Sequence, residues 1–362
     1  MKTMTRFAIT ILLFALPLWS GCGSLHGLQD WEIERKIADE KREQQSKAAQ
    51  LEAKQRLEHF LDAAKKGDAE AQYQLGKGYL DYVSGEDFWN FPIDEKKGIK
   101  WLRKAAEQGH ADAQFRLGWA YTCSSVPKNP VEGIKWFRKA AEQGHARAQC
   151  ELGNLYSMSN DHFQKKYYRR IISEDLTEAA RWYRKAAEQG DTGGQISLGV
   201  CYYYGRGVPE DKEEGVRWYR LAVEQGNSHA MALLGGCYYR GEGVPQNYTE
   251  AVKWYRQADE HGDPFARYEL GKCYYNGEGV PQDKAEAIRL FRRGGETSWS
   301  WYGGGKELIK WYLNDDYIPE EAELDGWFAT LRHLAEQDGQ SEYAVNEAKE
   351  AADLLHALER KR

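Results

Sequence analysis

The sequence is poor in several features that mark common functional classes. It has no excess of basic residues, since its formal net charge is -6, and sequence-independent nucleic-acid binding needs a basic surface. Its 6 cysteines form no Cys-x-x-Cys pair and its 9 histidines form no His-x-x-x-His pair, so a zinc-ligand spacing is missing. No Gly-x-Ser-x-Gly nucleophile elbow occurs either. We therefore predict no metal site, no cofactor, no catalytic residues and no nucleic-acid partner.

Proline is also scarce, with 9 residues, whereas aromatic residues make up 13% of the chain. A disordered chain would be poor in aromatic residues, so this chain is expected to fold. Glycine is frequent, with 36 residues, and much of it recurs at regular intervals. That regularity is typical of turns between helices rather than of a flexible linker.

The N-terminus lacks an apolar run of membrane-spanning length. Its 13-residue stretch from Phe7 to Trp19 follows Lys2 and Arg6, whereas a membrane span needs roughly 20 residues. A short apolar run after basic residues is typical of a secretion signal, which we place at residues 1–21. The protein is then exported, and removal of these two basic residues changes its formal charge from -6 to -8.

The end of this segment, Ser20-Gly21-Cys22, resembles a bacterial lipoprotein signal, although Trp19 stands where that pattern prefers leucine. The resemblance implies that the thiol of Cys22 receives a diacylglycerol and that acyl chains anchor the protein in a membrane. Gly23 replaces the aspartate that retains lipoproteins at the inner membrane, which favours the outer membrane, facing the periplasm. A plain secretory signal with an unmodified cysteine stays open as the alternative.

A polar segment follows the signal. Residues 29–56 are rich in Glu, Lys, Arg, Gln and Ala and show no sustained apolar heptad, which argues against a coiled coil. We interpret residues 22–56 as a lipid-attached, solvated helical tether. Phe60 to Gly67 resembles the second half of the repeat described next, so residues 57–67 are predicted to form a degenerate half-repeat.

One sequence unit recurs six times in the next part of the chain. A leucine–glycine pair marks each unit, at intervals of 42, 35, 46, 36 and 36 residues. The glycines of these pairs are Gly76, Gly118, Gly153, Gly199, Gly235 and Gly271. Tryptophans stand eight residues before the closing glycine of five units, at Trp101, Trp136, Trp182, Trp218 and Trp254. Self-similarity at a fixed period indicates a repeat protein.

The unit over residues 227–262 predicts two helices. Apolar residues at helical spacing run from Ala230 to Tyr239 and again from about Thr249 to Glu260. Gly241 to Pro245 separates them, because glycine supplies a left-handed residue that ends a helix and proline cannot continue one. Each unit is therefore a helix–turn–helix hairpin. A single hairpin cannot bury its apolar face, so neighbouring units must stack.

These residues resemble a known family. The pattern Ala-x-Ala-x-x-x-Leu-Gly-x-x-Tyr from Ala69 to Tyr79, the turn from Gly205 to Pro209 and the Ala-Ala-Glu-Gln-Gly ending at Gly109 are similar to the Sel-one-like repeat, a branch of the tetratricopeptide superfamily. The resemblance implies an all-α fold, a right-handed α-solenoid of stacked hairpins with a concave groove. It also implies a role as a protein-binding adaptor or scaffold.

The resemblance covers residues 68–295 in six repeats, at 68–109, 110–144, 145–190, 191–226, 227–262 and 263–295. A degenerate repeat and C-terminal capping helices are expected over 296–362, with a final helix from Ser341 to Leu358. Gly303 to Lys306 resembles only the end of a phosphate loop, because Ser300 stands where the leading glycine is needed. We predict a flexible break there.

Cysteine usage argues against disulfides. Cys201, Cys237 and Cys273 occupy one repeat position, 36 residues apart. Stacked equivalents lie about 10 Å apart, whereas a disulfide needs Cα atoms within about 7 Å. We expect these residues and Cys150 to be core residues with free thiols. They depart from the cysteine-rich branch of the resembled family, which pairs two cysteines in each hairpin and has been linked to penicillin binding.

That branch motivates an alternative function. Ser125-Val126-Pro127-Lys128 matches the Ser-x-x-Lys element of β-lactamases, which requires a formed helix. Here Pro127 falls in an inter-helix turn and the companion Lys-Thr-Gly is absent, so we interpret the match as chance. An accessory protein or hydrolase that acts on cell-wall glycan or peptide, and so binds peptidoglycan, stays as the alternative to an envelope-anchored, non-catalytic protein-interaction scaffold.

Partner recognition is predicted in two insertions. The first unit is 6 residues longer than 36, across Leu80 to Lys97, and the third is 10 residues longer, across Ser157 to Asp175. Insertions map to loops on one face of a repeat array, and aromatic residues and arginine dominate interface hot spots. The candidate partner-binding residues are Tyr82, Phe88, Trp89, Phe91, Phe163, Lys165, Lys166, Tyr167, Tyr168, Arg169 and Arg170. We predict an oppositely charged recognition edge there, with packing of the insertions on neighbouring hairpins as the alternative.

Overall fold

The computed structural model describes residues 26–80, 94–123, 129–157, 173–294, 304–314 and 342–361. Residues 1–21 and Cys22, most of both insertions, and Ser125 to Lys128 lie outside these ranges. Throughout the described ranges the chain forms helices and turns and no strand, which confirms the all-α prediction. It forms two compact units, Met1–Trp101 and Leu102–Arg362.

The first unit contains α2 (His26–Lys65), α3 (Ala69–Leu80) and the start of α4 (Glu95–Glu107). The helix α2 has 40 residues and runs without a break across residues 56 and 57, where the sequence suggests a change from tether to half-repeat. Its side chains over residues 35–48 are exposed. Short-range ion pairs such as Lys47–Glu43 support this polar part, whereas Ala64 near its end packs with Leu75 of α3.

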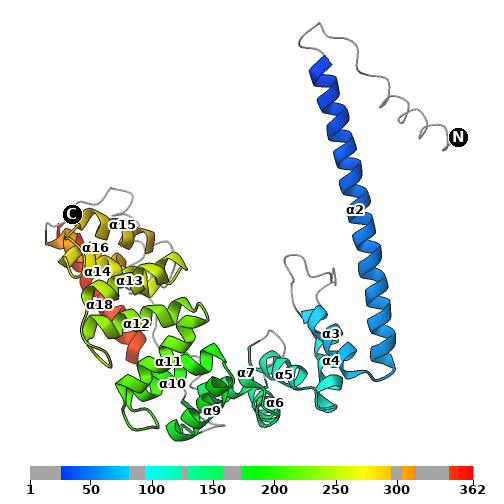
Figure 1. Cartoon of the computed structure of the whole chain (residues 1–362), viewed down its shortest axis with the longest axis horizontal. Helices are drawn as coiled ribbons and strands as arrows, with labels where there is room; N and C mark the ends of the chain where they lie inside the picture. Colours follow the sequence, from blue (N-terminus) through cyan, green and yellow to red (C-terminus); the bar gives the residue numbers. More distant parts are fainter. Residues whose placement is uncertain are drawn as a thin grey trace. The chain divides into compact units, whose positions relative to one another are not determined.

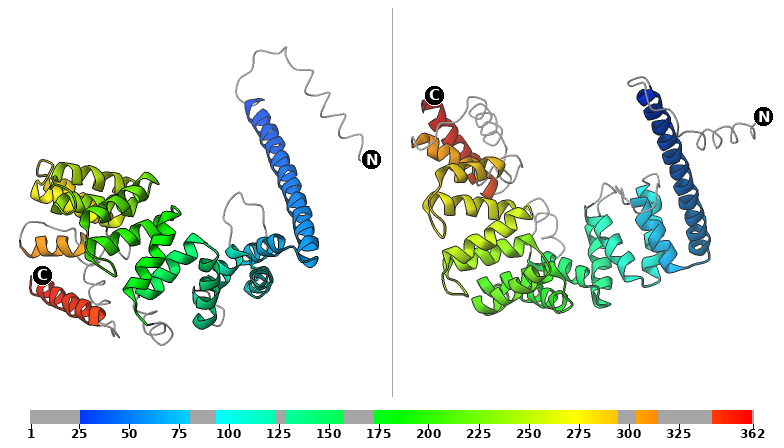
Figure 2. Two further views of the ribbon diagram at one scale, coloured as in Figure 1. Left: turned by 60° about the horizontal axis from the view of Figure 1, so that its bottom comes forward. Right: turned by 45° about the horizontal axis from the view of Figure 1, so that its top comes forward.

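The second unit stacks hairpins in chain order, as Figures 1 and 2 show for the helices from α5 to α15. The paired helices are α5 (Ala111–Cys123) with α6 (Pro130–Glu142), α7 (Ala146–Ser157) with α9 (Leu176–Glu188), α10 (Thr192–Tyr204) with α11 (Lys212–Glu224), α12 (Ser228–Arg240) with α13 (Tyr248–Glu260), and α14 (Pro264–Asn276) with α15 (Lys284–Gly294). The second unit is therefore an α-solenoid, as the sequence predicts.

Local sequence explains where these helices begin and end. Aspartate or asparagine caps the N-termini of α10 to α14, where each side chain accepts a hydrogen bond from the backbone N–H three residues on. Gly205, Gly241 and Gly277 end the first helices of three hairpins in the left-handed conformation. The turn between the two helices of each of these hairpins therefore begins at a left-handed glycine and ends at an Asp or Asn cap. The sequence alone thus sets these helix boundaries.

The repeated leucine–glycine pair packs each hairpin closely. A Cβ atom added at Gly235 would lie 2.8 Å from the ring of Tyr255 on the partner helix, and one at Gly271 would lie 2.5 Å from Phe291. The leucine before each glycine is buried, as in Leu234. Only glycine allows the large aromatic ring of the second helix to lie against the backbone of the first.

A second set of glycines joins one hairpin to the next. Gly207, Gly243 and Gly279 are the second glycines of the Gly-x-Gly turns, with φ of +75°, +72° and +75°. A Cβ atom at Gly243 would lie 2.3 Å from the backbone oxygen of Lys212, at the start of the second helix of the preceding hairpin. The turn of one repeat therefore packs directly on backbone of the repeat before it.

Buried glutamines add a polar connection between repeats. Gln72, Gln114 and Gln149 each donate a hydrogen bond of 3.0 Å to the backbone oxygen of the residue eight positions earlier, in the last turn of the preceding helix. Each of these carbonyls already accepts a hydrogen bond from the backbone N–H of the closing glycine, so the glutamine amide adds a second one from the next repeat. In the last repeat the same two positions hold Arg267 and Asp259, whose Nε and Oδ1 atoms lie 2.6 Å apart.

The open end of the last repeat is covered by α16 (Gly304–Leu313) and α18 (Glu342–Lys361). Leu308, Ile309 and Leu358 form a buried cluster with Phe291 of α15. The final helix thus packs, through Leu358, over the end of the last repeat. The predicted flexible break at Gly303 to Lys306 is wrong in part, because α16 begins at Gly304. Two glycines are accommodated in its first turn, where the following apolar residues pack against the last repeat.

Candidate interaction surface

The predicted partner-binding residues cannot be placed, because all of them lie in residues 81–93 and 158–172, outside the described ranges. They stay predictions, as does lipidation of Cys22. The inter-helix turns of the fourth, fifth and sixth repeats are described in full, at residues 205–211, 241–247 and 277–283. They lie at the turn ends of the hairpins and reveal a surface that the sequence reasoning missed.

This surface is a cluster of two tyrosines and two arginines at the C-terminal ends of α10 and α12, which we call the Tyr-Arg patch: Tyr203, Tyr204, Arg206 and Arg240. The rings of Tyr203 and Tyr204 meet edge to face with centroids 4.8 Å apart. The guanidinium carbon of Arg206 lies 5.2 Å from the centroid of the Tyr204 ring. Arg240, from the next repeat, donates from Nη2 to the hydroxyl of Tyr203 at 3.1 Å.

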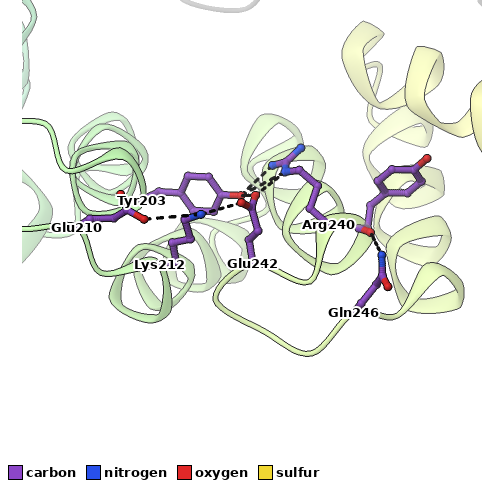
Figure 3. A network of polar contacts seen from close by, with 7 residues as sticks. Tyr203, Glu210, Lys212, Arg240, Glu242 and Gln246 are labelled. Carbon is purple, nitrogen blue, oxygen red and sulfur yellow. Dashed lines mark hydrogen bonds and ion pairs between the residues drawn. The ribbon is translucent and has the colours of Figure 1, made fainter.

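A hydrogen-bonded network holds two residues of the patch, Tyr203 and Arg240, in place (Figure 3). The carboxylate of Glu242 accepts hydrogen bonds from Nε of Arg240 at 2.8 Å and from Nζ of Lys212 at 2.7 Å, and the Tyr203 hydroxyl donates to it as well. Lys212 also lies over the Tyr203 ring, 5.5 Å from its centroid. Residues from two consecutive repeats therefore share one polar centre.

The electrostatics of this network follow from its donors. Hydrogen bonds from Lys212, Tyr203 and Arg240 lower the pKa of Glu242 from 4.5 to about 2. The carboxylate therefore remains charged at any pH above about 3, and it orients Arg240 rather than taking up a proton. Burial, followed by the hydrogen bond to Glu242, raises the pKa of Tyr203, so its hydroxyl stays protonated and continues to donate.

The patch is exposed enough to meet a partner. The side chain of Tyr204 is 56% exposed, and Arg206 and Arg240 are exposed too. Tyrosine and arginine are over-represented among the residues that carry binding energy in protein interfaces. The arrangement can therefore offer aromatic surface and guanidinium donors to another protein.

The patch belongs to one repeat interface because the middle residue of the Gly-x-Gly turn changes along the array. It is Arg206 in the fourth repeat, Glu242 in the fifth and Glu278 in the sixth. Glu278 accepts a hydrogen bond of 2.7 Å from the Tyr239 hydroxyl, which repeats the Tyr203–Glu242 contact one unit later. Aligning the turns could have shown this variation, but not that Arg240 reaches back to Tyr203.

Among the described residues, no cluster of three or more His, Cys, Asp or Glu side chains is placed to hold a metal ion. Within the same ranges, no helix is both long and apolar enough to span a membrane.

The repeats match an established family model. Residues 69–110, 111–145, 146–191, 193–227, 228–263 and 264–296 each match the Sel1 repeat, and together they make up most of the chain. The chain belongs to the Sel1 repeat family. Proteins with Sel1 repeats generally act as protein-interaction scaffolds.

Two solved structures are similar to this Sel1 repeat protein. One is a protective antigen of uropathogenic Escherichia coli with an SLR fold, at 30% identity and a TM-score of 0.59, covering 84% of this chain and 64% of that protein. This chain thus spans under two thirds of that relative's length. The other is a Sel1 repeat protein from Oxalobacter formigenes, at 30% identity and a TM-score of 0.56, covering 66% of this chain and 88% of that one. A comparison with curated proteins finds no match.

The four cysteines of this Sel1 repeat protein whose side chains the structure describes have free thiols, as the sequence predicts for them. Cys201, Cys237 and Cys273 are buried and Cys150 is half-buried. Burial raises the pKa of Cys201 and Cys237 to about 11 and that of Cys273 to about 12. Because the thiolate is the reactive form, these side chains are inert core residues at neutral pH.

We expect these thiols to react with Ellman's reagent only after unfolding. With pKa values near 11 instead of 9, about 100-fold less thiolate is present at neutral pH, and burial blocks access. The measurement uses a chain carrying Cys22→Ser and Cys123→Ser, so that the four described thiols alone remain. Rapid modification of three or more thiols in the native protein would contradict the buried placement, and the same assay in guanidinium chloride should count all four.

Proposed function

We propose that this Sel1 repeat protein is a non-catalytic protein-interaction scaffold that a lipid on Cys22 anchors in the bacterial cell envelope. The scaffold part is supported by the stacked repeats and by the family they belong to. The anchoring part rests on the sequence, in which a basic n-region, a 13-residue apolar run and Ser20-Gly21-Cys22 follow one another. The outer membrane, facing the periplasm, is the proposed location because Gly23 follows the cysteine.

The observation that carries the scaffold proposal is the Tyr-Arg patch. Its Tyr203 and Arg240 side chains are held by contacts across a repeat interface, so these two need little further ordering when a partner binds. Tyr204 is 56% exposed although a neighbouring ring and a guanidinium pack on it. A rigid aromatic surface with fixed cationic donors fits a protein partner, and it lies on hairpins whose spacing is set by close glycine contacts.

The test expresses the full chain with a C-terminal affinity tag in the bacterium that encodes it, supplied with labelled palmitate. We expect label in the wild type and none in a Cys22→Ser variant, because the acyl chains need the thiol. Capture from the detergent-solubilised envelope should then recover one protein in near-stoichiometric amount, identified by mass spectrometry. An identically tagged, unrelated lipoprotein is the control.

Each arm of this test can fail separately. If the wild-type protein is exported but carries no palmitate label, the lipid anchor is rejected and a secreted scaffold remains. Recovery of no protein, together with co-sedimentation of the folded chain with purified peptidoglycan, would reject the scaffold. That result would favour the alternative, a protein that acts on cell-wall glycan or peptide.

A further inference from the structure

Histidine caps the first helix in two neighbouring repeats. The backbone N–H of Ala148 donates to Nδ1 of His145 at 3.1 Å, so this imidazole caps α7. His110 caps α5 in the same way, at 3.3 Å. In the other four repeats the equivalent residues accept this bond through a side-chain oxygen, and they are Asp68, Asp191, Asn227 and Asp263. Histidine is the side chain whose charge ordinarily changes between pH 5 and 8, so the cap of α7 is open to protonation in mild acid.

The contacts of His145 fix the position of its proton. Since Nδ1 accepts a bond from a backbone N–H, it carries no hydrogen, and the neutral ring is protonated at Nε2. That nitrogen lies 3.3 Å from Oδ1 of Asp112, in the first turn of α5, and donates to it. The ring of Phe115, also on α5, stacks on the imidazole with centroids 4.7 Å apart. Neutral His145 therefore joins the start of α7 to the preceding repeat.

Protonation of His145 removes the cap. The added proton must go to Nδ1, where it turns the acceptor into a donor that faces the N–H of Ala148. A positive charge then lies at the N-terminus of α7, where the helix dipole disfavours cations. The folded junction therefore disfavours the protonated ring, and its stability is complete at neutral pH and falls as the pH decreases.

The charged groups around His145 do not reverse this effect. Asp112 on α5 contacts the ring, but it is 59% exposed, and ion pairs to an exposed carboxylate contribute little. Among the described residues, α6, α9 and α10 place no charged side chain in contact with the imidazole. Along its own chain the neighbouring charges, Glu142 and Arg147, have opposite signs. Loss of an N-cap therefore outweighs the strengthened ion pair.

A second histidine–aspartate contact has the two residues in reversed order. At the start of α14 the cap is Asp263, whose Oδ1 accepts from the N–H of Ala266 at 2.7 Å. Nδ1 of His229, in the first turn of α12, lies 3.5 Å from Oδ2 of this carboxylate, which is 7% exposed. Asp263 is the charged group that the described structure places in contact with His229. Protonation of His229 leaves the cap of α14 in place and adds an ion pair to it.

We propose that the junction between the second and third repeats is sensitive to mild acid, because protonation of His145 removes the cap of α7 and loosens its first turn. The junction between α12 and α14 stays intact under the same conditions. Because the hairpins stack in chain order, loosening one junction changes the placement of the repeats on either side of it. This response is a property of the array and does not depend on which partner, if any, it binds.

Hydrogen exchange of the full chain, followed by mass spectrometry at pH 7.5 and pH 5.5, tests the proposal. Labelling times are scaled for the slower intrinsic exchange at acidic pH. We expect the protection of the first-turn amides of α7, including that of Ala148, to fall about tenfold at pH 5.5, because the cap is lost. The start of α14, including Ala266, should keep or gain protection.

Matched variants then assign the effect to the cap. H145N is the decisive one, because asparagine caps α12 in this protein and does not titrate. The first turn of α7 in H145N should be equally protected at both pH values. D112N should leave the wild-type loss in place or enlarge it, since it removes only the ion pair. H229N is the control and should leave the response of α7 unchanged. Circular dichroism checks folding.

Three results would overturn the inference. Wild-type α7 could keep its protection at pH 5.5, and abolition of that protection by D112N would then show that the ion pair outweighs the cap. H145N could lose as much protection as the wild type, which would place the acid response elsewhere. Equal losses at the starts of α7 and α14 would indicate that acid destabilises the whole array rather than one junction.

Discussion

Replacing Asp259 by alanine is expected to lower the free energy of unfolding by about 3–5 kcal/mol, because it leaves the guanidinium of Arg267 buried without its partner. The two side chains are only 8% and 10% exposed and meet at 2.6 Å. Arg267→Gln should cost a similar amount, since Asp259 would keep only Arg293, at 3.5 Å. Urea denaturation followed by circular dichroism, supported by hydrogen exchange at the last two repeats, measures the change.

The double variant D259A/R267Q should be within about 1 kcal/mol of the wild type, because buried ion pairs are often replaceable without net loss. It restores the pattern of Gln72, Gln114 and Gln149, in which a glutamine amide donates to the backbone oxygen eight residues earlier beside an alanine. Arg293, which loses its contact with Asp259 in this variant, is 52% exposed, so its guanidinium can be solvated instead. Additive losses in the double variant would contradict the view that the two positions exchange as a pair.

Replacing Gly243 by alanine is expected to destabilise the array by about 3 kcal/mol or more. Its φ of +72° is strained for alanine, by about 1–2 kcal/mol, and its new Cβ would lie 2.3 Å from the backbone oxygen of Lys212. Since backbone cannot rotate away as a side chain can, the turn must move off the preceding repeat. Thermal and urea unfolding of the full chain would measure the loss.

The Gly226→Ala variant separates the energetic cost of backbone strain from that of a steric clash. Gly226 has a similar φ of +79°, but nothing lies within 4 Å of its added Cβ. Gly226→Ala should therefore lower the free energy of unfolding only by the cost of backbone strain, about 1–2 kcal/mol. Equal effects of the two substitutions would show that the Gly-x-Gly turn does not depend on its close approach to the neighbouring repeat.

The sequence determined the repeat architecture almost completely. Leucine–glycine pairs, Asp or Asn caps and left-handed glycines act within a single hairpin, and each recurs in register. The helices of residues 227–262 therefore lie close to the positions that periodicity predicts. The burial of Cys201, Cys237 and Cys273 could also be predicted from the sequence, because residues at the same position of successive repeats have similar surroundings.

Only the tertiary structure decided how particular repeats differ where they meet. Arg240 bonds to Tyr203, 37 residues earlier, and no local pattern indicates which side chain it reaches. The Asp259–Arg267 pair likewise replaces a glutamine contact whose existence the sequence does not reveal. Helix formation and capping depend on neighbours within about four residues, whereas side-chain choice between stacked hairpins depends on packing across a whole repeat. The candidate patch belongs to this second kind of information, which is why the sequence predicted the scaffold but not this surface.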